Sequence, residues 1–88
     1  MNSAQDIVFG RSANQVSHTF RHTDALGLDR MDVMEAIRRD LQQYLPLPIP
    51  PPSDFLFVGK VTVGGIELRY RAYPVNEGLV NVGRITGI

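Results

Sequence analysis

A run of prolines divides this chain into two halves that differ in the spacing of their apolar residues. Five of the six prolines lie between residues 46 and 52. Because proline lacks a backbone N–H and fixes φ, the run can form neither a helix nor a central strand, and it predicts an extended polyproline II connector over residues 46–53. Across the connector the spacing of apolar residues changes from the period of a helix to that of a strand.

The segment before the prolines has the spacing of two helices. Ser12 and Gly27 are typical start and stop residues, so we expect a first helix over residues 13–25. Asp29 caps a second helix, expected over residues 30–44. Residues 1–11 show no period and are expected to be poorly ordered or to form a short edge strand. The side chains expected to face the core are Ala13, Val16, Phe20, Thr23, Val33, Met34, Ile37, Leu41 and Tyr44.

The segment after the prolines alternates apolar and polar residues, as a half-buried strand does. Gly64-Gly65 predicts a two-residue hairpin turn, because glycine takes positive φ freely. Pro74 is expected to end the return strand, and residues 79–86 to form the next one. The sequence therefore predicts an α+β fold, with two N-terminal helices packed on one face of a three- to four-stranded antiparallel sheet. In this division residues 12–45 are helical and residues 54–88 form the antiparallel meander.

Length and composition limit the classes of site and partner that this chain can have. Eighty-eight residues form one domain, over residues 1–88, and no segment approaches the ~20 apolar residues of a membrane helix. The formal net charge is zero, so any phosphate site must be a local one. The chain has no cysteine, which excludes a thiolate metal site. We expect no cofactor and no membrane partner.

The only two histidines, His18 and His22, lie four residues apart on the first expected helix. They share a face there, on the side away from the apolar residues, so both should be accessible. Cleavage of RNA without a metal needs one group to take the proton of the 2′-OH, another to protonate the 5′-oxygen, and a cation near phosphorus. The pair fits these roles, although two ordinary surface histidines would look the same. A zinc site fits less well, because Thr19 stands where a zinc protease has glutamate.

Arginines on the strands could supply the cations. Arg69, Arg71 and Tyr73 fall on one strand face by the two-residue repeat. Arginine can bind phosphate oxygens in bidentate fashion and tyrosine can stack on a base, so this face could bind RNA, while an ordinary solvated face explains it equally well. Arg84 and Thr86 share a strand face near the end of the sequence. The two side chains could hold a phosphate, and an ordinary surface strand end would explain them as well.

The order of these parts resembles the C-terminal toxin domains of bacterial polymorphic and contact-dependent growth inhibition systems, and within them the ribonuclease toxins of the barnase, EndoU, colicin and RelE fold group. The resemblance covers about residues 12–86. Its most specific pieces are Ser17-His18-Thr19-Phe20-Arg21-His22, Tyr70-Arg71-Ala72 and Asn81-Val82-Gly83-Arg84.

The resemblance implies a metal-independent endoribonuclease that cleaves RNA, with tRNA the favoured substrate, to 2′,3′-cyclic phosphate ends. It implies delivery from a larger secreted or surface protein, action in the cytoplasm of a target bacterium, and a cognate immunity protein that covers the site. The neutral net charge departs from the basic character of such nucleases.

The resemblance also implies roles for single residues. His18 and His22 would be the acid and the base, Arg71 and Arg84 the phosphate cations, and Thr86 a hydroxyl near the scissile bond. The side chains expected to bind substrate are Arg21, Arg69 and Tyr73. Two other interpretations stay open: a non-catalytic interaction module, such as an antitoxin or adaptor, and a toxin with another target, such as a nucleotide.

Overall fold

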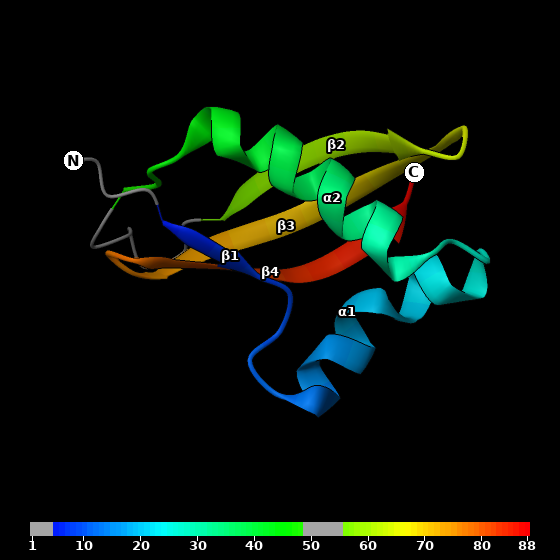
Figure 1. Ribbon diagram of the computed structural model, residues 1–88, viewed down its shortest axis with the longest axis horizontal. Coiled ribbons are helices and arrows are strands. Elements are labelled where there is room, and N and C mark those ends of the chain that lie inside the picture. The colour runs from blue at the N-terminus through cyan, green and yellow to red at the C-terminus, as the bar shows by residue number, and fades with distance from the viewer. Residues whose placement is uncertain (1–4, 49–55) are drawn as a thin grey trace.

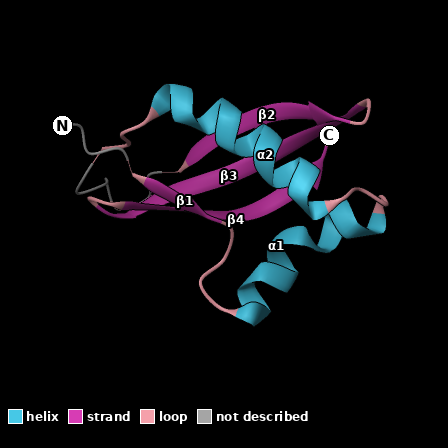
Figure 2. Cartoon of the chain, viewed as in Figure 1, coloured by secondary structure: helices cyan, strands magenta, loops and turns pink. Residues whose placement is uncertain are grey.

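The computed structural model describes residues 5–48 and 56–88, and it has the predicted α+β fold (Figure 1). Residues 49–53 of the expected connector lie outside the described part. Two helices precede the main part of a four-stranded sheet, whose strand order is β1-β4-β3-β2 (Figure 2). The elements are β1 (Asp6–Val8), α1 (Ala13–Ala25), α2 (Arg30–Leu41), the short 3₁₀ helix η1 (Gln42–Tyr44), β2 (Phe57–Val63), β3 (Ile66–Asn76) and β4 (Leu79–Gly87).

The sheet is mixed, because one of its pairings is parallel. β2, β3 and β4 form the predicted antiparallel meander, and Gly64 and Gly65 turn the hairpin with φ of 58° and 80°. The short strand β1, however, runs parallel to β4, with Asp6 opposite Leu79. The N-terminal edge strand thus forms, and it pairs with the last strand of the chain.

Pro74 was predicted to end its strand, and this is wrong. β3 continues through Pro74 to Asn76 and pairs there with β4, while among the described residues the last β3 residue that pairs with β2 is Ala72. Proline is tolerated in a strand beside an irregularity of the pairing, and a register shift directly follows Pro74. The turn that follows is the expected one, and the Gly78 N–H donates to Asn76 Oδ1 at 2.8 Å.

Both helices begin at the predicted residues because their caps are local. Ser12 Oγ accepts the N–H of Gln15 at 3.2 Å, and Asp29 Oδ2 accepts the N–H of Asp32 at 3.2 Å. The first helix stops just before Gly27, whose φ is +77°. The last turn predicted for the second helix forms η1 instead.

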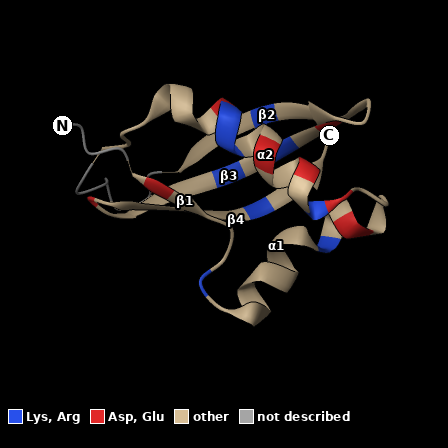
Figure 3. Ribbon diagram, in the orientation of Figure 1, with Lys and Arg blue, Asp and Glu red and all other residues tan. Residues whose placement is uncertain are grey.

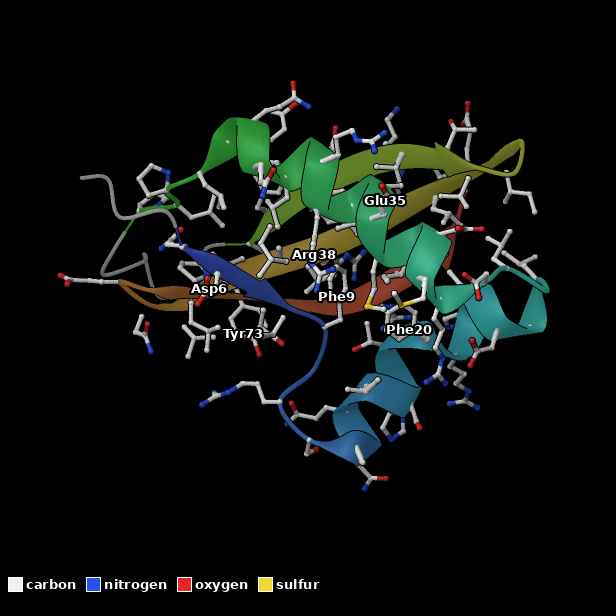
Figure 4. All side chains as sticks on the ribbon, viewed as in Figure 1. Asp6, Phe9, Phe20, Glu35, Arg38 and Tyr73 are labelled. Atoms are coloured by element: carbon white, nitrogen blue, oxygen red, sulfur yellow. The ribbon has the colours of Figure 1, made fainter. Side chains whose placement is uncertain are left out.

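The core lies between the helices and the inner face of the sheet. In Figure 1, α2 lies across the sheet and α1 lies beside β4, against which it mainly packs. Phe9, just after β1, joins this core and contacts the ring of Phe20 at 5.8 Å between centroids (Figure 4). The buried apolar side chains are Phe9, Phe20, Val33, Ile37, Leu41, Leu47, Val63, Leu68, Tyr70, Ala72, Val80, Val82 and Ile85.

Two expectations about burial are corrected by this packing. Ala13 is exposed because it lies at the very start of α1, and Tyr44 on η1 is 51% exposed, with only one side of its ring against Phe57 of β2 at 4.9 Å between centroids. Thr19, for which no burial was predicted, is buried because α1 lies directly against β4 at that point. Its hydroxyl lies 2.9 Å from the carbonyl oxygen of Gln15 and 3.4 Å from that of Gly83.

Candidate functional site

A cleft of about 320 Å³ lies between α1 and the outer face of the sheet. α1 runs beside β4 in the same direction, since Thr19 lies near Gly83 and Leu26 packs beside Gly87. The cleft opens where this helix passes the outward-facing side chains of β3 and β4. The polar side chains that line it are Gln15, His18, Thr19, Arg71, Tyr73, Asn81 and Arg84.

The two arginines of the cleft are direct neighbours across the sheet. Arg71 on β3 pairs with Arg84 on β4, while the next β3 residue, Ala72, pairs with Val82. Gly83 is therefore an extra residue in β4, a bulge that turns the side chain of Arg84 outward. Figure 3 shows these basic positions on the sheet.

Like charges placed opposite each other on neighbouring strands repel and lower stability. Within residues 5–48 and 56–88 the ion pairs are Arg30 with Asp24 and Arg39 with Glu35, so neither Arg71 nor Arg84 has a carboxylate partner in that part of the chain. Two adjacent guanidinium groups that have no carboxylate partner among the described residues are the arrangement that binds a phosphate or another oxyanion.

The histidines are both exposed, as predicted, but they take different places relative to the cleft. His18 lines it together with Arg71 and Arg84, so a residue of α1 and two residues of the sheet meet there. His22 lies one helical turn further along α1 and is not among the lining residues.

Of the other predicted site residues, one lines the cleft and the rest lie outside it. Tyr73 lines the cleft, two positions after Arg71 on the same strand face. Thr86 and Arg69 pair with each other across β4 and β3, two positions beyond the arginine pair and outside the lining. Arg21 is exposed on α1 and is also outside.

Sequence reasoning assigned no role to Asn81, although its side chain connects three parts of the cleft. Asn81 is only 3% exposed. Its Oδ1 accepts the backbone N–H of Gly10 at 2.9 Å, and its Nδ2 donates to the hydroxyl of Tyr73 at 3.1 Å. The available signal was a single amide between Val80 and Val82 in an apolar strand.

Comparisons with protein-family models, with curated proteins and with solved structures found no match. Neither helix of the described residues has the length and the apolar character that crossing a membrane would require. Those same residues contain no group of three His, Asp or Glu side chains placed to hold a metal ion.

Proposed function

We propose that this domain is a metal-independent endoribonuclease toxin that cleaves RNA to 2′,3′-cyclic phosphate ends, with tRNA as the substrate to test first. One observation carries the proposal: His18 of α1 and the paired Arg71 and Arg84 of the sheet line one cleft. A group that can accept a proton thus faces two cations that can bind a phosphate.

The reaction follows from what these groups can do. The two guanidinium groups bind the non-bridging oxygens of one phosphodiester and stabilise the charge that develops there. His18, as the base, takes the proton of the adjacent 2′-OH, and the 2′-oxygen attacks phosphorus. Because the nucleophile belongs to the substrate, no metal-bound water is needed. His22 as the second proton-transfer group stays a prediction from the sequence, as do Thr86 near the scissile bond and Arg21 and Arg69 in substrate binding.

The biological setting is part of the same proposal and rests on the resemblance to interbacterial toxins. The domain would be delivered from a larger secreted or surface protein and act in the cytoplasm of a target bacterium. A cognate immunity protein would cover the cleft, and an acidic surface would complement Arg71 and Arg84.

The test is cleavage of total tRNA by the purified protein in EDTA, with the fragment ends identified. We expect 2′,3′-cyclic phosphate ends, no cleavage of DNA, and a loss of about 10² to 10⁴ in rate for His18→Ala. Arg39→Gln is the control, because Arg39 is exposed on α2 and pairs with Glu35. Cleavage that stops in EDTA and returns with Zn²⁺ would contradict the proposal.

A second candidate is a non-catalytic module that binds an acidic protein. The outer face of the sheet supports it, because Lys60 lies opposite Arg69 beside the arginine pair of the cleft, and basic residues thus extend over three strands. Such a module would cleave no RNA, either as the wild-type protein or as the His18→Ala variant.

A further inference from the structure

The orientation of the Asn81 side chain is fixed by the backbone. The Gly10 N–H can only donate, so the atom 2.9 Å from it must be the amide oxygen of Asn81. The amide nitrogen then faces Tyr73, at 3.1 Å from its hydroxyl oxygen. The Gly10 N–H thus removes the usual ambiguity between the oxygen and the nitrogen of an asparagine side chain.

The direction of this hydrogen bond decides where the hydroxyl proton of Tyr73 points. Since Asn81 donates, the phenol oxygen accepts, and its own proton is directed away from Asn81. Tyr73 is 38% exposed and lines the cleft, and it donates to no other group in the part of the chain that the structure describes. Its O–H is therefore available to a ligand in the cleft.

Gln15 is oriented by the same principle. Its Oε1 accepts the backbone N–H of Arg11 at 2.7 Å, which leaves Nε2 as a donor. The guanidinium groups of Arg71 and Arg84 can only donate. Among the described side chains of the cleft, Gln15, Tyr73 and the two arginines thus each offer a free donor, and the His18 ring offers a nitrogen that can accept a proton. A phosphoryl group, with several acceptor oxygens, matches this set.

Resting on the proposed ribonuclease function, we infer that Tyr73 is a catalytic residue that protonates the departing 5′-oxygen, in place of His22, and that Asn81 is its positioning residue. The 2′-OH proton moves to the His18 ring nitrogen as the bond from the 2′-oxygen to phosphorus forms. The bond from phosphorus to the 5′-oxygen breaks, its electron pair stays on that oxygen, and the Tyr73 proton moves there. The phenolate keeps the hydrogen bond from Asn81 and regains a proton from protonated His18 through water.

The test compares two dinucleotide substrates that differ only in the leaving atom. One has the natural 5′-oxygen, and the other has sulfur there, which leaves as a thiolate without needing a proton. Tyr73→Phe should lose on the order of 10² to 10⁴ in rate on the oxygen substrate and less than about tenfold on the sulfur substrate. His18→Ala should lose on both substrates, because the 2′-OH needs its base in either case. Tyr44→Phe is the matched control, since Tyr44 is exposed on η1 and outside the cleft.

Asn81→Asp tests the positioning role without changing side-chain shape. A carboxylate oxygen there can still accept the Gly10 N–H, but the other oxygen would accept the Tyr73 O–H and turn its proton out of the cleft. We expect the same result as for Tyr73→Phe: a large loss of rate on the oxygen substrate and only a small loss on the sulfur substrate. Asn14→Asp makes the same charge change at an exposed position of α1 and is the control. Thermal unfolding and circular dichroism show whether each variant is folded.

The outcomes separate this inference from the function on which it rests. If the wild-type protein cleaves RNA but Tyr73→Phe stays within about tenfold on the oxygen substrate, or loses equally on both substrates, Tyr73 is not the acid and the ribonuclease proposal stands. If His22→Ala instead shows loss on oxygen and rescue on sulfur, the acid is His22. A wild-type protein that cleaves no RNA overturns both.

Discussion

The hydroxyl of Tyr70 donates a hydrogen bond to Asp40 Oδ2 at 2.6 Å, and this bond joins the buried face of β3 to α2. Asp40 is only partly exposed, because it turns toward the sheet to make this bond. The ring of Tyr70 reaches Asp40 over Gly59 of β2, because no side chain of residue 59 stands in its way. Burial, and then the neighbouring carboxylate, raises the pKa of the Tyr70 hydroxyl above its usual value.

Tyr70→Phe should lower the free energy of unfolding by about 1–3 kcal/mol, since it leaves a half-buried carboxylate without its partner. Urea unfolding measures the change. In Tyr44→Phe, an exposed counterpart, the shift should stay within about 0.5 kcal/mol. Equal stability of the two variants would show that the bond to Asp40 contributes nothing.

The raised pKa of Tyr70 predicts a loss of stability in alkali. The native state keeps the Tyr70 proton after unfolded tyrosine begins to lose its proton near pH 10, so the unfolded state binds fewer protons above that pH. The contribution is therefore full below about pH 10 and declines as the pH rises further. Unfolding followed from pH 8 to pH 11 should show this decline in the wild-type protein and a smaller one in Tyr70→Phe.

Gly59→Ala should destabilise the domain by about 1–3 kcal/mol, the usual effect of an added methyl group in a packed site. The added Cβ would collide with the ring and hydroxyl of Tyr70. Gly78→Ala is the matched control, because its Cβ would meet only Asn76 Oδ1, at an ordinary 3.7 Å. A Gly59→Ala protein as stable as this control would mean that the Tyr70 ring can move aside freely.

Replacing one arginine of the cleft should affect stability and activity in opposite directions. Arg84→Gln removes a like charge directly opposite Arg71, so the free energy of unfolding should rise by about 0.2–1 kcal/mol. Under the proposed function the same change would remove a donor to the phosphate, and the rate of RNA cleavage should fall by about 10²–10³. Arg39→Gln should neither raise the free energy of unfolding nor lower the cleavage rate. A destabilised Arg84→Gln protein would indicate that Arg84 has a structural partner.

Ser12→Ala should lower the free energy of unfolding by about 1 kcal/mol, because the Gln15 N–H loses its acceptor at the start of α1. Ser17→Ala, at an exposed position within the same helix, should be neutral or slightly stabilising. Thermal unfolding of the two variants gives the difference. Similar melting temperatures would show that the cap does not hold this helix.

Local chemistry explains what the sequence predicted well. Ser12, Asp29 and the Gly64-Gly65 pair act through residues no more than a few positions away, so the helix starts and the hairpin could be placed from sequence. The two-residue repeat likewise placed Arg71 and Tyr73 on one outward face of the sheet.

What sequence reasoning missed depends on contacts between distant residues. That Pro74 could continue its strand depended on its pairing with β4 and the register shift there, and the parallel pairing of β1 depended on a strand far along the sequence. The contact of Asp40 with Tyr70 required Gly59 on a third element. At the cleft, the Gly83 bulge set the position of Arg84, and the Asn81 amide depended on Gly10. Apart from Gly83 and Arg84, these partners are distant in the chain, and the bulge at Gly83 itself depends on the pairing with β3.

The hydrogen bond from Gly10 to Asn81 spans 71 positions in the sequence. Closing so long a loop has a large entropic cost, so contacts of this kind form when the rest of the fold is already in place. A chain with only its helices and hairpin formed would hold His18 apart from Arg84, and Tyr73 would lack the amide that orients it. The cleft is thus a product of complete folding, because its lining residues come together only when the segment before α1 reaches the last strand.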